Sequence, residues 1–308
     1  MSDIKINLNS LNPTTFKKTV RHKVQDGSNI FRFLPPFGQE ANGYPYRKWN
    51  VVWGLTDPTS GRERPFASPS TYEGECPVFD FLDILKVKLE EIGSTLGEVK
   101  TKEINDFISN LRPKTVYSYN ASNKAGQVGV LELKTTAHKK VIAAMSKYIT
   151  DYNQDPTSLN ASPADSGLWF NVTKAGRGFD TTYDAAKNQS MIKDVHGIPS
   201  YQDDRSPLAE SIVHNFDTLA YDLNNIYQKL TYQELKEILV VNLENFAKLQ
   251  NLPEILVPGF GLPEAAFAQS PGPEIKRADS KVKLALDNAE DIDDTDDVIA
   301  MADKIFNS

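Results

Sequence analysis

The order of short strand-like segments and helical insertions most restricts what this chain can fold into. Apolar and aromatic residues predict strands at residues 29–36, 46–55, 114–120, 128–134, 168–174 and 178–184. Helical spacing predicts helices at 77–93 and 102–111, after the second strand, and at 135–152, after the fourth. Strands and helices do not alternate one for one, as they do in doubly wound parallel sheets. The pattern therefore predicts a mixed α+β protein with a small closed or half-open barrel, of which the OB-type β-barrel is one example.

The two ends of the chain differ from this central part. Residues 1–28 have weak periodicity and a basic cluster, so we expect a basic N-terminal arm; its basic residues include Lys17, Lys18, Arg21 and Lys23. The core, residues 29–250, ends in a helical portion over residues 206–250. Residues 251–286 hold five prolines and are interpreted as a linker. Residues 287–308 are interpreted as an acidic tail that is disordered on its own.

Charge is distributed unevenly along the chain. Residues 287–308 hold eight acids and one lysine, so they carry the whole net charge of −7 and the remaining residues sum to zero. Residues 1–150 hold 21 bases and 15 acids, a net of +6, whereas residues 151–286 hold 12 bases and 18 acids, a net of −6. A basic front half indicates a polyanionic partner, and an acidic tail can mimic that partner.

Aromatic and basic residues occur together on three separate strands. They are Tyr44, Tyr46, Arg47, Lys48, Trp49, Trp53, Lys114, Tyr117, Tyr119, Lys174, Arg177, Phe179 and Tyr183. Bases of a single nucleic-acid strand stack on aromatic rings, and Lys and Arg contact the phosphates. An aromatic residue on a strand is also a common core residue, and the alternation of Trp49, Val51 and Trp53 fits a core face. Composition alone leaves both interpretations open; Tyr117 and Tyr119 favour the groove, because a tyrosine keeps a polar tip.

The sequence resembles the single-stranded DNA-binding proteins of T-even-type tailed bacteriophages, a helix-destabilising family with an OB fold. The segments that carry the resemblance are FRFLPP (31–36), GECPVFDF (74–81), KTVYSYN (114–120), LELKTTAHKKVIAAM (131–145) and SGLWFNVTKAGRGFDTTYD (166–184). They occur in the family's order, between a basic arm and an Asp-rich tail. The resemblance covers about residues 15–250 and the tail.

The resemblance implies cooperative coating of single-stranded DNA during phage replication, recombination and repair. By position, Tyr117, Phe179 and Tyr183 match groove aromatics of the family, and Lys174 matches a groove base. The full set of expected DNA-binding residues is Arg32, Tyr46, Arg47, Lys48, Lys114, Tyr117, Tyr119, Lys134, Lys139, Lys174, Arg177, Phe179 and Tyr183. The arm residues Lys17, Lys18, Arg21 and Lys23 are expected to contact a neighbouring copy of the protein.

The tail combines an acidic run with an apolar stripe. Val298, Ile299, Ala302, Ile305 and Phe306 follow the last Asp of the run at helical spacing. We expect the acids to compete with DNA phosphates and the stripe to bind phage replication proteins. The residues assigned to this partner-binding tail are Asp293, Asp294, Asp296, Asp297, Ile305 and Phe306.

One motif departs from the family. Its better-known members hold a structural zinc through a His and a Cys-Pro-x-Cys unit. Here Phe79 stands at the second cysteine position, and no His lies between His22 and His138. A structural zinc site needs about four N or S ligands. We therefore expect no metal, with Cys76 buried as a small apolar residue and the segment up to Phe81 packed by apolar side chains.

The sequence offers little for catalysis. It has no GxxxxGK[ST] loop, and its four histidines lack metal-ligand spacing. We expect a non-enzymatic protein without a cofactor or membrane span, located in the host cell cytoplasm, that binds single-stranded DNA with little sequence preference. Two alternatives remain: a phage structural or assembly protein that uses the same barrel for protein contacts, and an RNA-binding regulator.

Overall fold

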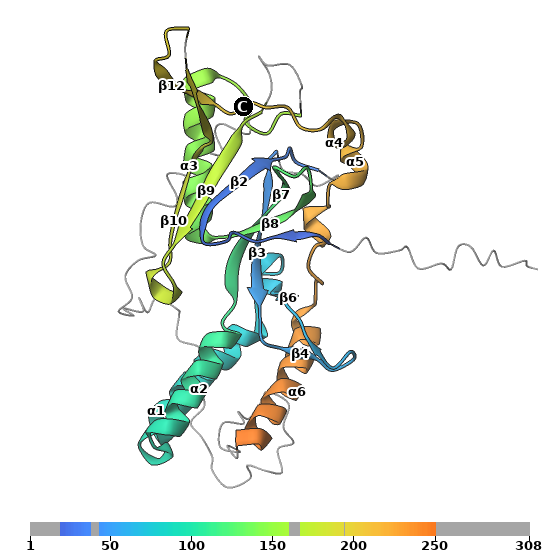
Figure 1. Cartoon of the computed structure of the whole chain (residues 1–308). Coiled ribbons are helices and arrows are strands. Elements are labelled where there is room, and N and C mark those ends of the chain that lie inside the picture. Colours follow the sequence, from blue (N-terminus) through green and yellow to red (C-terminus); the bar gives the residue numbers. More distant parts are fainter. Residues whose placement is uncertain (1–18, 38–42, 160–166, 194, 251–308) are drawn as a thin grey trace, which may run out of the picture.

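The computed structural model describes residues 19–37, 43–159, 167–193 and 195–250, apart from the side chains of residues 91–96, 179 and 250 (Figure 1). The strands are β1 (Arg21–His22), β2 (Gly27–Phe33), β3 (Tyr46–Val52), β4 (Thr56–Asp57), β5 (Arg62–Glu63), β6 (Phe66–Ala67), β7 (Lys114–Asn123), β8 (Val128–Lys134), β9 (Trp169–Ala175), β10 (Thr182–Lys187), β11 (Gln189–Lys193) and β12 (Pro199–Asp203). The helices are η2 (Pro69–Thr71), α1 (Pro77–Leu96), α2 (Glu98–Leu111), α3 (Thr135–Tyr152), η3 (Gly178–Asp180), α4 (Glu210–His214), α5 (Phe216–Leu219), η4 (Leu223–Asn225) and α6 (Tyr232–Gln250).

The fold is mixed α/β and is built on an eight-stranded, mostly antiparallel sheet. The long strand β7 lies at its centre, with β8 on one side. On its other side β7 pairs with β3 through its first half and with β2 through its second half. From β2 the sheet continues through β9 to β10. The two-residue strand β1 adds to the edge of β8 in the parallel sense.

The sheet is not closed into the predicted barrel. Among the described residues, the edge strands β1 and β10 have no ladder between them. Helix α3 instead packs against both β8 and β10. The helix therefore lies where a pairing of edge strands would close a barrel. The sheet is therefore open and mostly antiparallel, which contradicts the closed form of the predicted barrel but not the half-open form.

The core has two main parts, on either side of the junction between sheet and helices. One lies between the sheet and α3 and contains Phe33, Tyr119, Met145 and Phe170. The other joins β3 and β6 to α1, α2 and α6, the helical layer below the sheet in Figure 1. Helix α1 enters this second core because its apolar residues recur at helical spacing, with Pro77 in its first turn, where a proline costs no backbone hydrogen bond.

The predicted elements are largely present, with three differences. Helix α3 spans the predicted 135–152, and β7, β8 and β9 lie where strands were expected. The last predicted strand, 178–184, begins only at Thr182, because Gly178–Asp180 form a single 3₁₀ turn. The arm predicted for residues 1–28 contains strand β1 from Arg21, and the short strands β4, β5 and β6 and the β11–β12 hairpin were not predicted. None of the helices in the described ranges is long and apolar enough to cross a membrane.

Candidate nucleic-acid interface

Two open cavities meet at Lys134, the residue that joins β8 to α3. The first has a volume of about 430 Å³ and is lined by β1, β8, β9 and the loop after β9. The second has a volume of about 610 Å³ and is lined by the start of β7, the start of α3 and Trp53. Lys134 lines both cavities, so we treat them as one groove, which we call the Lys134 groove. Its lining includes the expected DNA-binding residues Lys114, Lys134, Lys174 and Tyr183, together with Lys23, which was expected in the N-terminal arm.

Three strands and the residue after β1 therefore each contribute a lysine to the groove. Lys23 follows β1, Lys114 begins β7, Lys134 ends β8 and Lys174 lies on β9. They are separated by up to 151 positions in the chain (174 − 23), and the sheet brings them together because β8 and β9 flank the central strands. Tyr183 and Trp53 are half-buried at the groove and supply aromatic surface beside these cations. This combination of cations and rings suits a single nucleic-acid strand.

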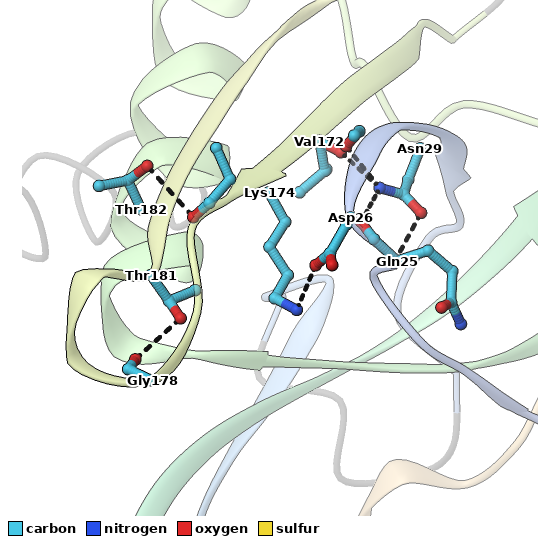
Figure 2. Close-up of polar contacts among 10 residues, drawn as sticks. Gln25, Asp26, Asn29, Val172, Lys174, Gly178, Thr181 and Thr182 are labelled. Atoms are coloured by element: carbon cyan, nitrogen blue, oxygen red, sulfur yellow. Dashed lines mark hydrogen bonds and ion pairs between the residues drawn. The ribbon is translucent and has the colours of Figure 1, made fainter.

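Lys174 is held by a carboxylate at the edge of the groove. Its Nζ donates to Oδ1 of Asp26, in the turn before β2, at 2.7 Å (Figure 2). The hydrogen bond raises the pKa of Lys174 and lowers that of Asp26, so both groups are charged near neutral pH. Both side chains retain contact with solvent, where ion pairs are weak and readily exchanged. A phosphate can therefore compete with Asp26 for Lys174.

The N-terminus of α3 adds backbone donors to the same place. Lys134 is the N-cap residue, its side chain makes no capping hydrogen bond, and the first turn contains no acid. The first N–H groups of a helix have no partner within the helix, and the helix dipole favours an anion beside them. Thr135 and Thr136 line the groove at this turn and supply hydroxyl groups. Backbone, hydroxyl and ammonium donors thus point to an anionic ligand.

The acidic side chain that lines the groove already has interaction partners. Glu132 forms an ion pair with Arg21 of β1 and accepts a hydrogen bond of 2.5 Å from the hydroxyl of Tyr227. Burial and the neighbouring Glu132 raise the pKa of Tyr227, which keeps its hydroxyl protonated and able to donate. Arg21 therefore fixes β1 to β8, and Lys23 reaches the groove because of that attachment. The assignment of Arg21 to a separate arm is corrected, whereas Lys17 and Lys18 lie outside the described residues.

Tyr117 and Tyr119 are core residues in the structure, which excludes them from an open groove. Tyr117 is 4% exposed and Tyr119 is fully buried. Tyr117 stacks on the ring of His138, with centroids 3.5 Å apart, and the Tyr119 hydroxyl lies 2.6 Å from Nδ1 of His138. Burial lowers the pKa of His138 to about 3, with a smaller contribution from Lys48, so the ring is neutral and shares one hydrogen bond with the Tyr119 hydroxyl. Helix α3 covers this strand face, which the strand pattern alone could not show.

Arg32 is also excluded from the interface, because its side chain is fully buried. Its Nη2 donates to the carbonyl of Ser158 at 2.9 Å, and burial lowers the pKa of the guanidinium to about 10. Strand β2 turns this residue toward the side that carries Leu34 and Trp169, and the neighbouring Tyr148, Asp155 and Asp204 partly offset the effect of burial on its pKa.

The other predicted residues lie around the groove without lining its two cavities. On β3, Lys48 is exposed and Tyr46 is half-buried against His138. Arg47 and Trp49 share the other face of the strand, with the Arg47 guanidinium 5.6 Å from the ring centre of Trp49. Lys139 is half-buried on α3, and Arg177 is exposed beside η3. The side chain of Phe179 is outside the described part of the structure. Tail residues Asp293, Asp294, Asp296, Asp297, Ile305 and Phe306 lie outside the described ranges as well.

Sequence reasoning missed two parts of the groove. Trp53 was left open between groove and core and was not among the expected DNA-binding residues. The structure buries Trp49 and Val51 and leaves Trp53 half-buried at the second cavity. The Thr135-Thr136 pair was not selected. The sequence feature that could have identified this pair is a strand that ends in lysine directly before a helix. That order places the free backbone N–H groups of the first helical turn beside a cation.

The segment around Cys76 does not fit a zinc site. Cys76 and Phe81 are buried in the helical core, and burial raises the pKa of the thiol, which disfavours the thiolate that binds metal. In the described ranges no three His, Cys, Asp or Glu side chains are grouped as metal ligands. Phe79, expected to pack in place of the missing ligand, is 41% exposed on α1 instead.

The sequence was also compared with known proteins. No protein-family model and no curated protein matches the chain.

Proposed function

We propose that this protein binds single-stranded DNA in the Lys134 groove with little sequence preference. The observation that carries the proposal is the convergence of Lys23, Lys114, Lys134 and Lys174 on a groove that also presents Tyr183 and Trp53. Lysines of this kind suit phosphates, and aromatic rings suit bases that have left a duplex stack. The open sheet supports a partly open OB-type arrangement, with the groove across its strands.

The shape of the site favours a single strand over a duplex. The groove is lined by strand ends and the start of one helix, together with two aromatic rings. A duplex hides the faces of its bases, and its readers present a helix or ribbon to the major groove. A phage replication, recombination and repair role follows from the resemblance and is part of this proposal. It includes contacts of the N-terminal residues with a neighbouring copy and of the tail with replication proteins.

Fluorescence titration with oligo-dT, duplex DNA and RNA of equal length tests the proposal. We expect the tightest binding to oligo-dT, and weaker binding for Lys134→Gln. The slope of log K against log salt should become shallower by about 0.7 for each lysine–phosphate interaction that the substitution removes. Lys102→Gln is the matched control, because Lys102 is exposed on α2 outside the groove residues.

Two outcomes would overturn the assignment. If Lys134→Gln and Lys102→Gln bind oligo-dT equally well, the ligand does not use this groove. If the wild-type protein binds no nucleic acid at low salt, a structural or assembly role replaces DNA binding. Tighter binding to RNA than to DNA would favour the RNA-binding alternative.

A further inference from the structure

Most of the large apolar side chains that are exposed on the described surface fall into two groups. The first lies on the β11–β12 hairpin: Met191, Ile192, Val195, Ile198 and Tyr201. The second lies on the helical layer and follows α1 through Phe79, Ile84 and Val87. Figure 1 places the hairpin and the helical layer at opposite ends of the molecule. Neither group lines the Lys134 groove.

The hairpin stands away from the rest of the sheet. All five residues of β11 are exposed, and in β12 only Asp203 is half-buried. Met191 pairs with Tyr201 across the two strands, and Val195, in the turn, is 95% exposed. The hairpin is tied to β10 at its base, where Lys187 donates to Asp203. Its apolar side chains therefore contribute little to the stability of the chain that carries them.

The exposed stripe on α1 is likewise not needed for the internal packing of the helix. The opposite face of α1 buries Phe81 and Leu85 in the helical core. Ile84 is 39% exposed and Val87 is 49% exposed, and they lie three residues apart, on neighbouring turns. A helix with one apolar face buried and a second apolar stripe exposed is typical of a surface that binds a partner.

We propose that the β11–β12 hairpin of one copy packs on the α1 stripe of the next copy along a DNA strand. The two surfaces differ, so each contact joins a hairpin to a helix. Because they lie at opposite ends, the contact does not close into a symmetric dimer and repeats along a line. Charge supports this partner: exposed Lys193 lies beside Ile192 on the hairpin, and exposed Asp83 lies beside Ile84 on α1. This inference rests on the proposed DNA binding.

The size of the hairpin explains why the contact depends on DNA. Two strands of five residues offer much less than the ~800 Å² per partner that a stable interface buries. In free solution the copies should therefore be monomers at micromolar concentration. Two copies on adjacent sites of one strand have an effective concentration on the order of millimolar, so a weak contact suffices there.

The test compares binding to an oligo-dT that accommodates one protein with binding to long poly-dT. The hairpin variant is Met191→Lys/Val195→Lys, and the helix variant is Ile84→Glu/Val87→Glu. We expect both variants to bind the short oligonucleotide like the wild type and to lose about tenfold or more of the additional affinity on poly-dT. The control Ser190→Lys/Ser200→Lys adds the same charge to exposed polar positions of the hairpin and should keep cooperative binding.

A mixing experiment identifies the partner surface. In a 1:1 mixture of the two variants, alternating copies place the new lysines against the new glutamates, and the other junctions are wild type. Cooperative coating of poly-dT should therefore return in the mixture and in neither variant alone. A hairpin that contacts another hairpin, or a partner other than this chain, would give no recovery and would overturn the proposal.

The remaining outcomes separate this inference from the proposed function. If both variants keep wild-type cooperativity on poly-dT, the hairpin–helix contact is wrong while DNA binding stands. If the wild type binds neither the short nor the long DNA, the proposed function fails first. Melting temperatures of all variants within a few degrees of the wild type would show that the changes act at the surface.

Discussion

At the scale of single residues, burial separates the tyrosines that sequence patterning could not separate. Tyr117 and Tyr183 are both tyrosines on strands, and both match groove positions of the resembled family. In the structure Tyr117 stacks on His138 beneath α3, whereas Tyr183 is half-buried at the Lys134 groove. The ring that is covered by a helix stabilises the fold, and the ring at the cavity is available to a ligand.

Alanine substitutions at these two tyrosines should therefore have opposite effects. Tyr117→Ala leaves a cavity in the core and should lower the free energy of unfolding by about 3–5 kcal/mol, as measured by urea denaturation. Its oligo-dT affinity, corrected for the folded fraction, should be unchanged. Tyr183→Ala should weaken oligo-dT binding by about 1–3 kcal/mol with little effect on unfolding. The reverse pattern would place Tyr117 in the site and Tyr183 in the core.

His138 should make the stability of the fold depend on pH. Its pKa in the folded protein is about 3, below the ordinary value near 6.5, mainly because the ring is buried. Between these two values the unfolded chain takes up a proton at this residue and the folded chain does not. Stability is therefore fully present above about pH 6.5 and falls as pH decreases toward 3, by ~1.4 kcal/mol per pH unit.

Urea denaturation at pH 7 and pH 5 measures this dependence. His138→Phe keeps a ring that can stack on Tyr117 and has no titrating group. Between pH 7 and pH 5 the wild type should lose about 2 kcal/mol more than this variant. Equal losses in both proteins would show that His138 is not the neutral, buried group described here.

At the scale of elements, the two-residue strand β1 changes how the basic N-terminal segment is assigned. The basic cluster around Arg21 indicated an arm independent of the sheet. The structure pairs β1 with β8 and links Arg21 to Glu132, which brings Lys23 to the groove. Residues 21–23, at the end of the expected arm, therefore belong to the sheet edge and to the lining of the groove.

Two truncations test the role of β1. Removing residues 1–18 leaves β1 in place and should preserve both stability and affinity for a short oligonucleotide. Removing residues 1–24 takes away Lys23 and the Arg21 partner of Glu132. This longer truncation should bind short oligo-dT more weakly, with a salt slope shallower by about 0.7, and should unfold at lower urea. Identical behaviour of the two truncations would show that β1 contributes nothing to the groove.

At the scale of the whole molecule, the uneven distribution of charge bears on regulation. The lysines of the groove come mainly from the basic front half, and the net charge of −7 belongs to residues 287–308. A tail of that charge can compete with DNA phosphates for the same cations. Competition of this kind weakens as salt screens the charges, with a Debye length of ~10 Å at 0.1 M.

Deleting residues 287–308 should therefore raise DNA affinity, most strongly at low salt. The measurement is oligo-dT titration of the full chain and the truncated chain at several salt concentrations. Replacing the eight acids of this segment by Asn or Gln, at constant length, controls for the shortening of the chain. An affinity that does not change at low salt would contradict competition by the tail, and retained binding of replication proteins would contradict a docking role for its apolar stripe.

The sequence by itself determined the order of elements and the types of residue available for binding. Local periodicity indicated the strands at 128–134 and 169–175 and the helix at 135–152. It is a good predictor of such elements because each of them buries its apolar face. Lys134 and Lys174 were among the basic residues expected to bind DNA, and both line the groove.

Only the tertiary structure decided which faces are covered and which lysines meet. Strand β7 is buried on both faces, with Tyr117 under α3 and Val116 on the other side. The residue pattern of a strand does not indicate that a helix about twenty residues further along the chain will pack on it. The open sheet, the fixed β1 and the exposed β11–β12 hairpin likewise depend on contacts between distant segments. Such contacts depend on how the apolar faces of all the elements are buried at the same time. The local sequence of one segment does not contain that information.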